Sequence, residues 1–149
     1  MVDSVVKLVI GSDHAGFQLK EHIKTHFGAA GWMFHDLGTG SGNAMDYPDV
    51  AHPVAKAVQS GEFSSGILLC GSGNGVAITA NKYTGIRAAL CWDEEITRLA
   101  RLHNDANILV LPARYITEEQ AIRFVEVFFS TSFEGGRHER RVKKISDML

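Results

Sequence analysis

The sequence has few cysteines, almost no net charge and no long apolar run, and each shortage excludes a class of protein. Two cysteines in 149 residues cannot form the disulfide framework of a small secreted protein. No stretch approaches the roughly 20 apolar residues that cross a bilayer. The N-terminal segment MVDSVVKLVIGSD carries an early acid and only a short apolar run, unlike a signal peptide. We therefore expect a cytoplasmic protein without a membrane partner.

The formal net charge of −2 provides no broad basic field, so nucleic acid is not an expected partner. Any anion site must therefore be local. The length of 149 residues suits one domain, and we expect residues 1–149 to form it. A chain of this size buries about 68–70% of its unfolded surface on folding, so it needs no disulfide or metal for stability.

Short apolar runs alternate with helical patterns along the chain. The runs predict strands at residues 5–10, 32–37, 66–70, 86–91 and 107–111. The segments between them predict helices at residues 16–30, 47–59, 75–83, 93–103 and 117–130. Several runs are apolar at successive positions, which is typical of strands buried on both faces of a parallel sheet. Five strand–helix units predict an α/β sandwich with helices on both faces of a five-stranded parallel sheet.

Local signals support two of these helices, and a further helix follows them. Asp93 is placed to cap the fourth helix, and Thr117 with Gln120 has the form of a capping box. A basic segment, residues 136–149, comes after the Gly-Gly pair at 135–136 and predicts an extra C-terminal helix. This helix lies outside the five units and is free to pack on a partner.

In an open parallel sheet, ligands bind beyond the carboxyl ends of the strands. This rule selects five loops as candidates for a site. GSDHAG offers Asp13 and His14, and GTGSGNAMDYP offers Asp46 and Tyr47. The other three are CGSGNG, CWDEE and PAR, the last of which contains Arg114.

The CGSGNG loop raises the main chemical question. Its backbone N–H groups can face an anion at the start of a helix. It matches the dinucleotide fingerprint poorly, because it follows the third strand and its last glycine is misplaced. Cys70 is either a small apolar residue that closes a buried strand, or a thiolate favoured by the helix start that acts as base or nucleophile. Its position leaves both readings open, whereas Cys91 is expected to pack in the core.

Two polar groups elsewhere are also ambiguous from their positions. His103 and Asn104 stand at the end of the fourth helix, where a packed imidazole and a capping amide are as well supported as chemistry. Arg137 and Arg141 lie one turn apart on the final helix. They form either a solvated basic face or a pair of planar forks for phosphate.

Seven strings taken together are far more specific: SDHAGF, DYPD, ILLCGSGNG, ITANK, GIRAAL, LARLHNDANILVL and EGGRHERRV. In order and spacing they resemble the family of ribose-5-phosphate isomerase B and galactose-6-phosphate isomerase subunits, over nearly the whole chain. The resemblance implies reversible isomerisation of D-ribose 5-phosphate and D-ribulose 5-phosphate in the pentose phosphate pathway. The reaction proceeds through ring opening and an enediolate, without a metal or nucleotide cofactor. It also implies a three-layer Rossmann-like sandwich with strands one and three adjacent.

The resemblance also implies a role for each matching residue. Cys70 would be the base, Asp13 would hold sugar hydroxyls, and His103 would open the furanose ring. Ser72 would stabilise the enediolate oxygen, together with the backbone at Gly71, Gly73, Asn74 and Gly75. Some relatives use a glutamate just after the glycine loop, but the residue here is Val76, which cannot take a proton. This departure favours Cys70 as the base.

Substrate binding and assembly follow from the same resemblance. Phosphate would contact His14, Arg114, Arg137 and Arg141, while Tyr47 and Asn104 would contact the sugar. A homodimer or tetramer is implied, with shared active sites and the C-terminal helix, about residues 136–149, on the partner subunit. His103, Asn104 and the three arginines would serve the site across the interface.

Two other functions remain as alternatives. The nearer one is isomerisation of a hexose 6-phosphate, either allose or galactose 6-phosphate, because pocket width is not readable from sequence. The other is a non-catalytic Rossmann-like module that binds a nucleotide through the GSGNG loop.

Overall fold

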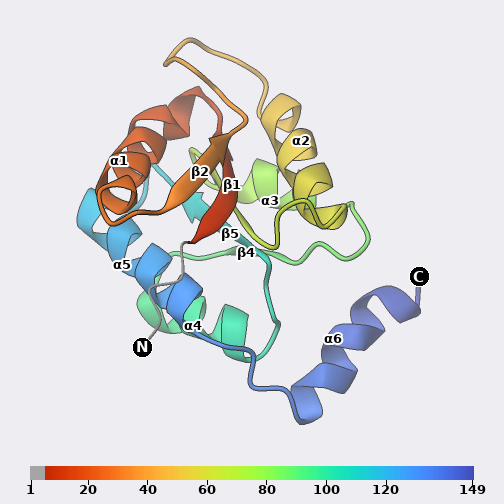
Figure 1. Cartoon of the computed structure of the whole chain (residues 1–149). Helices are drawn as coiled ribbons and strands as arrows, with labels where there is room; N and C mark the ends of the chain where they lie inside the picture. Colours follow the sequence, from red (N-terminus) through yellow and green to blue (C-terminus); the bar gives the residue numbers. More distant parts are fainter. Residues whose placement is uncertain (1–5) are drawn as a thin grey trace.

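A five-stranded parallel sheet in the order β2-β1-β3-β5-β4 forms the centre of the molecule (Figure 1). The structure is a computed structural model that describes residues 6–149. The strands are β1 (Lys7–Ser12), β2 (Met33–Asp36), β3 (Gly66–Cys70), β4 (Ala88–Leu90) and β5 (Ile108–Pro112). The helices are α1 (Phe17–Gly28), α2 (Pro48–Gln59), α3 (Asn74–Ala80), α4 (Glu94–Leu102), α5 (Glu118–Ser130) and α6 (Arg137–Asp147), with a short 3-10 helix, η1 (His14–Gly16). The expected fold class is confirmed, including the adjacency of strands one and three.

Helices cover both faces of the sheet and create two hydrophobic cores (Figure 1). One core packs α1, α4 and α5 against side chains such as Leu69 and Leu111. The other packs α2 and α3 against alternate residues of the same strands, including Leu68 and Val110. Because successive residues face opposite cores, β3 and β5 are apolar and buried along their whole length.

Strand β1 runs further than its apolar residues indicate. Gly11 and Ser12, expected in the following loop, pair with Leu68 and Leu69 of β3 and extend the strand to Ser12. Glycine is needed at position 11 because a Cβ there would collide with Val50 of α2. The predicted start of this strand at Val5 lies outside the described residues.

Both predicted helix caps are present. The Asp93 carboxylate accepts from the Ile96 N–H at 2.9 Å. The Thr117 hydroxyl accepts from the Gln120 N–H, and the Gln120 side chain accepts from the Thr117 N–H, which completes the capping box. The predicted helix at residues 75–83 ends early, at Ala80. No helix in the described part of the chain is both long and apolar enough to cross a membrane.

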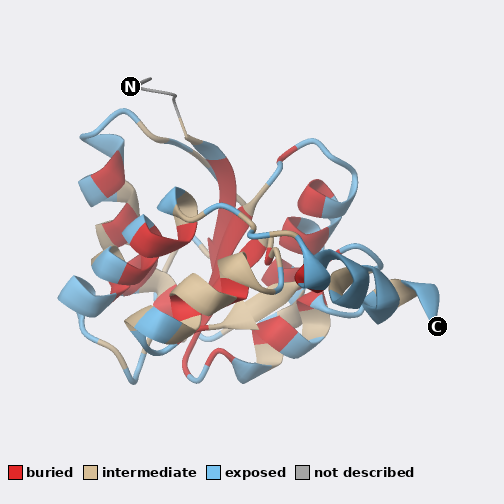
Figure 2. Ribbon diagram, turned by 90° about the horizontal axis from the view of Figure 1, so that it is seen from below, coloured by how far each residue is buried: buried red, intermediate tan, exposed pale blue. Residues whose placement is uncertain are grey.

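Helix α6 stands apart from the sheet and its two helical layers (Figure 1). Gly135 and Gly136 both have positive φ, which explains the Gly-Gly pair at this turn. Seen from below, the helix is exposed over most of its length (Figure 2), and His138 is its only buried residue. The extra helix is therefore confirmed, and most of its surface is free of contacts with its own chain.

A fully buried lysine, which the sequence reading did not anticipate, ties α1 to the loop after β2. The Nζ of Lys20 donates to both Asp36 carboxylate oxygens at 2.8 Å and to the Thr39 carbonyl at 2.6 Å. Burial acts to raise the pKa of Asp36, but hydrogen bonds from Lys20, Lys24 and the Gly38 N–H outweigh it and hold that pKa below its usual value.

Replacing this lysine tests the contribution of the pair to stability. Lys20→Met should lower the free energy of unfolding by about 2 kcal/mol. Removing one partner of a fully buried ion pair typically costs roughly 3–5 kcal/mol, and the loss is smaller here because Lys24 still binds Asp36. The Asp36 pKa is lowered by folding, so its stabilisation is present above pH ~4 and lost as the pH falls further. Urea unfolding should therefore show a shallower loss on acidification in Lys20→Met than in the wild type. Lys24→Met is the matched control, and an equal loss in both variants would contradict the importance of burial.

Candidate active site

The carboxyl ends of β1, β3 and β5 surround a cavity of about 320 Å³. Parallel pairing places these ends at one edge of the sheet, with Ser12 opposite Leu69 and Cys70 opposite Pro112. The cavity is lined by Asp13, Tyr47, Cys70, Gly71, Ser72, Gly75, Arg114 and Tyr115. Seven of these eight residues are candidates named from the sequence, drawn from four separate loops.

Cys70 closes β3 and presents its sulfur to the turn that follows. Its side chain is only 5% exposed, and its Sγ accepts a hydrogen bond from the Gly73 N–H at 3.1 Å. Gly73 itself adopts a left-handed conformation, with φ of 80°, which favours glycine. A side chain at position 73 would also collide with Leu90. The turn therefore needs glycine here, and it directs a backbone donor at the thiol.

The other glycines of the turn allow side chains from neighbouring loops to lie directly against its backbone. Tyr47 packs against Gly75, where an added Cβ would lie 2.6 Å from the tyrosine Cζ, and Arg114 crosses Gly71. Ser72 Oγ accepts from the Asn74 N–H at 3.2 Å. The first N–H groups of α3 lack intrahelical acceptors, so the turn offers donors beside the thiol.

Asp13 and His14 follow β1 at the same edge. Asp13 is 7% exposed and one of its carboxylate oxygens accepts from the Gly16 N–H at 3.1 Å. His14 is not part of the cavity lining, and its Nδ1 accepts from the Met45 N–H at 3.2 Å. Because an imidazole nitrogen that accepts carries no proton, the proton of His14 is on Nε2. His14 is thus prepared to donate one hydrogen bond to an anion.

One candidate lies elsewhere than expected. Arg114 was expected to reach the site across an interface, but it lines the cavity of its own chain. Two contacts place it there: β5 pairs with β3, and the Arg114 N–H donates to Gly71 O at 3.0 Å. The Asn74 side chain lines a different hollow, beside Leu90. Tyr115 was missed, although an aromatic residue next to Arg114 in a loop at this edge was a usable signal.

A second group of candidates gathers at the opposite edge of the sheet. His103 caps the end of α4, and the chain then enters β5 at its amino end. The Glu134 N–H donates to Leu102 O at 3.1 Å, which places the start of α6 beside this helix end. One chain therefore brings together His103, Asn104 and the N-terminal turn of α6, and separates them from Cys70. Arg137 and Arg141 are exposed on α6 and do not reach the cavity.

The His103 ring stacks on the ring of His138, with centroids 4.1 Å apart and planes at 12°. Burial lowers the pKa of His138, and the neighbouring His103 and nearby arginines lower it further, whereas Glu134 acts to raise it. Within residues 6–149 the buried Nε2 of His138 has no hydrogen-bond partner, and a carboxylate oxygen of Glu134 lies 3.4 Å away.

The cluster His103, Glu134 and His138 has the composition of a metal site, with ligand atoms within 4.8 Å of one another. Its geometry does not fit one. A metal ion lies in the plane of each imidazole that binds it, and two rings stacked nearly parallel cannot direct nitrogens at the same ion. The stack instead fixes α6 to the end of α4.

Comparison with known proteins gives a consistent result. A family model described as Ribose/Galactose Isomerase matches residues 8–145. The ribose-5-phosphate isomerase B of Escherichia coli is 43% identical over 140 residues, which cover 94% of each protein.

Solved structures of similar proteins have the same fold. A ribose 5-phosphate isomerase from Thermotoga maritima superposes with a TM-score of 0.93 at 53% identity, covering 95% of this chain and 98% of that protein. Ribose-5-phosphate isomerase B from Mycoplasma genitalium, solved with bound ribulose-5-phosphate, gives 0.91 at 41% identity, covering 96% of this chain and 95% of that protein. The likeness therefore extends over almost the whole length of both chains.

The two thiols should differ sharply in reactivity. Cys91 is completely buried, and burial raises the pKa of its thiol to about 11, although a hydrogen bond with Thr97 acts in the opposite direction. Cys70 lines the cavity. Iodoacetamide at pH about 8 should give one adduct per folded chain, on Cys70, because the thiolate is the reacting form. Peptide mass spectrometry locates the adduct, Cys70→Ser provides the control, and equal labelling of Cys91 would contradict the assignment.

Proposed function

Because this chain belongs to the ribose/galactose isomerase family, we propose that it interconverts D-ribose 5-phosphate and D-ribulose 5-phosphate. Relatives that match nearly its whole length are named for this reaction, and one of them binds ribulose-5-phosphate. The observation that carries the proposal is the cavity itself. It holds a thiol, a carboxylate and an arginine together with a turn rich in N–H donors.

Cys70 transfers the proton in this mechanism. Its thiolate removes the hydrogen on C2 of the open-chain aldose, and the electron pair moves toward the C1 carbonyl to form an enediolate. The hydroxyl proton on O2 moves to O1, and the same sulfur returns its proton to C1, which leaves the carbonyl on C2. General base catalysis of this kind contributes about 10²–10⁴ in rate. The Gly73 N–H at 3.1 Å holds the sulfur toward the turn.

The turn stabilises the charge that develops on the enediolate oxygen. We assign this role to Ser72 and to the backbone N–H groups of Gly71, Gly73, Asn74 and Gly75, at the start of α3. Gly71, Ser72 and Gly75 line the cavity, which supports the assignment. Fixed donors require no reorganisation during the reaction, so they favour the transition state over the substrate. Ser72 retains a free proton to donate, because its oxygen accepts from the Asn74 N–H.

Other residues hold the substrate. Asp13 keeps one carboxylate oxygen free of the Gly16 N–H and accepts sugar hydroxyls with it. Tyr47, which packs on Gly75, lines the sugar. Arg114 and the Nε2–H of His14 donate to the phosphate.

A homodimer completes the site. In one chain, His103 and Asn104 lie at the opposite sheet edge from Cys70, and Arg137 and Arg141 lie on an exposed helix (Figure 2). We assign His103 of the partner subunit to opening of the furanose ring, with Asn104 on the sugar and both arginines on the phosphate. The chain has two free thiols, and we assign catalysis to one of them. Free thiols persist in a reducing compartment, so we place this step of the pentose phosphate pathway in the cytoplasm.

The reaction can be tested directly. Purified protein in EDTA should convert ribose 5-phosphate to the ketopentose, and allose 6-phosphate in a parallel assay reports on hexose preference. Cys70→Ala should lower kcat by about 10²–10⁴, because the base is lost, while thermal stabilisation by ribose 5-phosphate persists. Ser72→Ala should cost less than ~10³ because backbone donors remain. A folded wild-type protein without turnover would refute the isomerase proposal, and stabilisation by ATP or NAD instead would favour a nucleotide-binding module.

Mixing two inactive variants tests whether sites are shared. Cys70→Ala and His103→Ala protomers, each nearly inactive alone, should recover roughly a quarter of wild-type activity when co-refolded in equal amounts, since half the dimers then contain one intact site. Size-exclusion chromatography checks that dimers form. Lack of recovery in mixed dimers would show that both residues act within one chain.

A further inference from the structure

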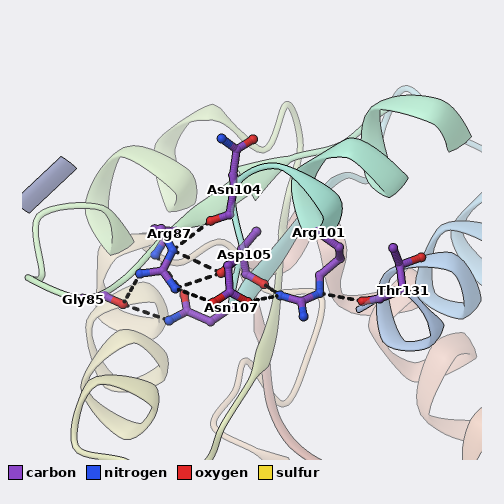
Figure 3. A network of polar contacts seen from close by, with 8 residues as sticks. Gly85, Arg87, Arg101, Asn104, Asp105, Asn107 and Thr131 are labelled. Atoms are coloured by element: carbon purple, nitrogen blue, oxygen red, sulfur yellow. Dashed lines mark hydrogen bonds and ion pairs between the residues drawn. The ribbon is translucent and has the colours of Figure 1, made fainter. Parts of the chain in front are cut away.

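The segment between α4 and β5 has no regular secondary structure, yet it is held by two arginines, Arg101 of α4 and Arg87 just before β4 (Figure 3). It carries His103 and Asn104, to which the proposed function assigns ring opening and sugar contact. Asp105, the next residue, has φ of 47°, in the left-handed region that non-glycine residues seldom adopt. Such a conformation persists only where surrounding contacts determine it.

Arg87, from the GIRAAL stretch just before β4, provides most of these contacts. Its Nε donates to the Asn104 carbonyl at 2.9 Å and to the Asp105 carbonyl at 3.1 Å. Its Nη2 donates to the same Asp105 carbonyl at 2.9 Å and lies 3.5 Å from the Asp105 carboxylate. One planar guanidinium therefore binds two successive carbonyls of the segment through N–H groups fixed in one plane.

Arg101 binds the other side of the segment. Its Nη1 donates to the Asp105 carboxylate at 2.9 Å and to the Ala106 carbonyl at 2.7 Å, while its Nε donates to Thr131 at the end of α5. The Asp105 carboxylate thus lies between two guanidinium groups from separate elements (Figure 3). The carbonyls of residues 104, 105 and 106 all accept from arginine.

The side chains that precede this clamp are free to act on a ligand. The Asn104 amide points away from the network and makes no hydrogen bond within the described part of its own chain (Figure 3). The His103 ring is fixed on one face by His138 and is partly exposed. The backbone is rigid and its functional groups are unpaired, which is the arrangement of a preorganised half-site.

We propose that Arg87 is a positioning residue for the isomerase reaction: by clamping the Asn104 and Asp105 carbonyls, it sets the position of His103 and Asn104 against the furanose ring bound by the partner subunit. Arg87 acts through the backbone and does not itself touch the substrate. This role rests on the proposed function, and it concerns ring opening rather than proton transfer at Cys70.

The experiment separates ring opening from proton transfer. Arg87→Ala should lower kcat for ribose 5-phosphate by about 10²-fold. The rate at which the C1 hydrogen of ribulose 5-phosphate exchanges with deuterium should change by less than about fivefold. The two results differ because a displacement of about 1 Å affects only the step that uses the displaced group. Ribulose 5-phosphate cannot form a furanose, since its C5 oxygen carries the phosphate. Its exchange therefore needs the Cys70 side of the site but no ring opening. Proton NMR in D₂O measures both rates.

Further variants exclude a merely structural effect. Asp105→Asn tolerates the left-handed backbone but removes the charge between the two arginines. It should therefore change the two rates in the same direction as Arg87→Ala does, but by a smaller factor. If Arg87→Ala does not fold, Asp105→Asn provides the test. Arg98→Ala removes an α4 arginine whose side chain pairs with Glu94 and Glu95 on the same helix, and it should leave both rates unchanged. Thermal melting checks the fold of each variant.

The outcomes distinguish this role from the proposed function. Equal losses of isomerisation and exchange in folded Arg87→Ala, or full retention of isomerisation in both Arg87→Ala and Asp105→Asn, would overturn the positioning role and leave the isomerase intact. A wild-type protein that neither isomerises ribose 5-phosphate nor exchanges the ribulose 5-phosphate hydrogen would overturn the proposed function, and with it any role of Arg87 in catalysis.

Discussion

Pairing of β3 between β1 and β5 is the constraint on which the rest of this structure depends. It places Asp13 next to the end of β3, through the bond from the Asp13 N–H to Leu69 O at 3.2 Å. On the other side, the Ala113 N–H donates to Cys70 O at 2.9 Å, and the Arg114 N–H donates to Gly71 O. The thiol, the carboxylate and the guanidinium therefore meet because three buried strands end together. A shift of register would separate them before it exposed any of the core.

Close packing around the glycine turn after β3 limits the kind of ligand that the turn can bind. Its glycines lie against Tyr47, Arg114 and Leu90, so the space around the turn is taken by side chains that define a small cavity. Two backbone N–H groups of the turn, those of Gly73 and Asn74, donate to the Cys70 sulfur and to the Ser72 oxygen. This is a better fit to a small charged intermediate than to an extended dinucleotide, whose pyrophosphate requires open glycines along a fingerprint loop.

The candidate site residues form two groups on opposite edges of the sheet, and each group is built differently. The Cys70 group depends on strand ends and a tight turn. The His103 group depends on polar clamps, namely the arginine network around Asp105 and the stack between His103 and His138. Each half is ordered within a single chain. In the proposed homodimer, assembly would therefore cost little conformational entropy at the site, because both groups are already held within their own chains.

Local patterns in the sequence were sufficient for the strands, the Asp93 cap, the Thr117–Gln120 box and the loops that supply the cavity, since periodicity and capping depend on near neighbours. The ordered motifs were sufficient for the family and for Cys70 as a candidate. Only the tertiary structure decided that Arg114 lies in its own chain's cavity, that Lys20 is buried on Asp36, and that Arg87 holds the backbone beside His103. The physical reason is that these contacts join residues distant in sequence, and their partners are often backbone carbonyls, which leave no signal in the residue types.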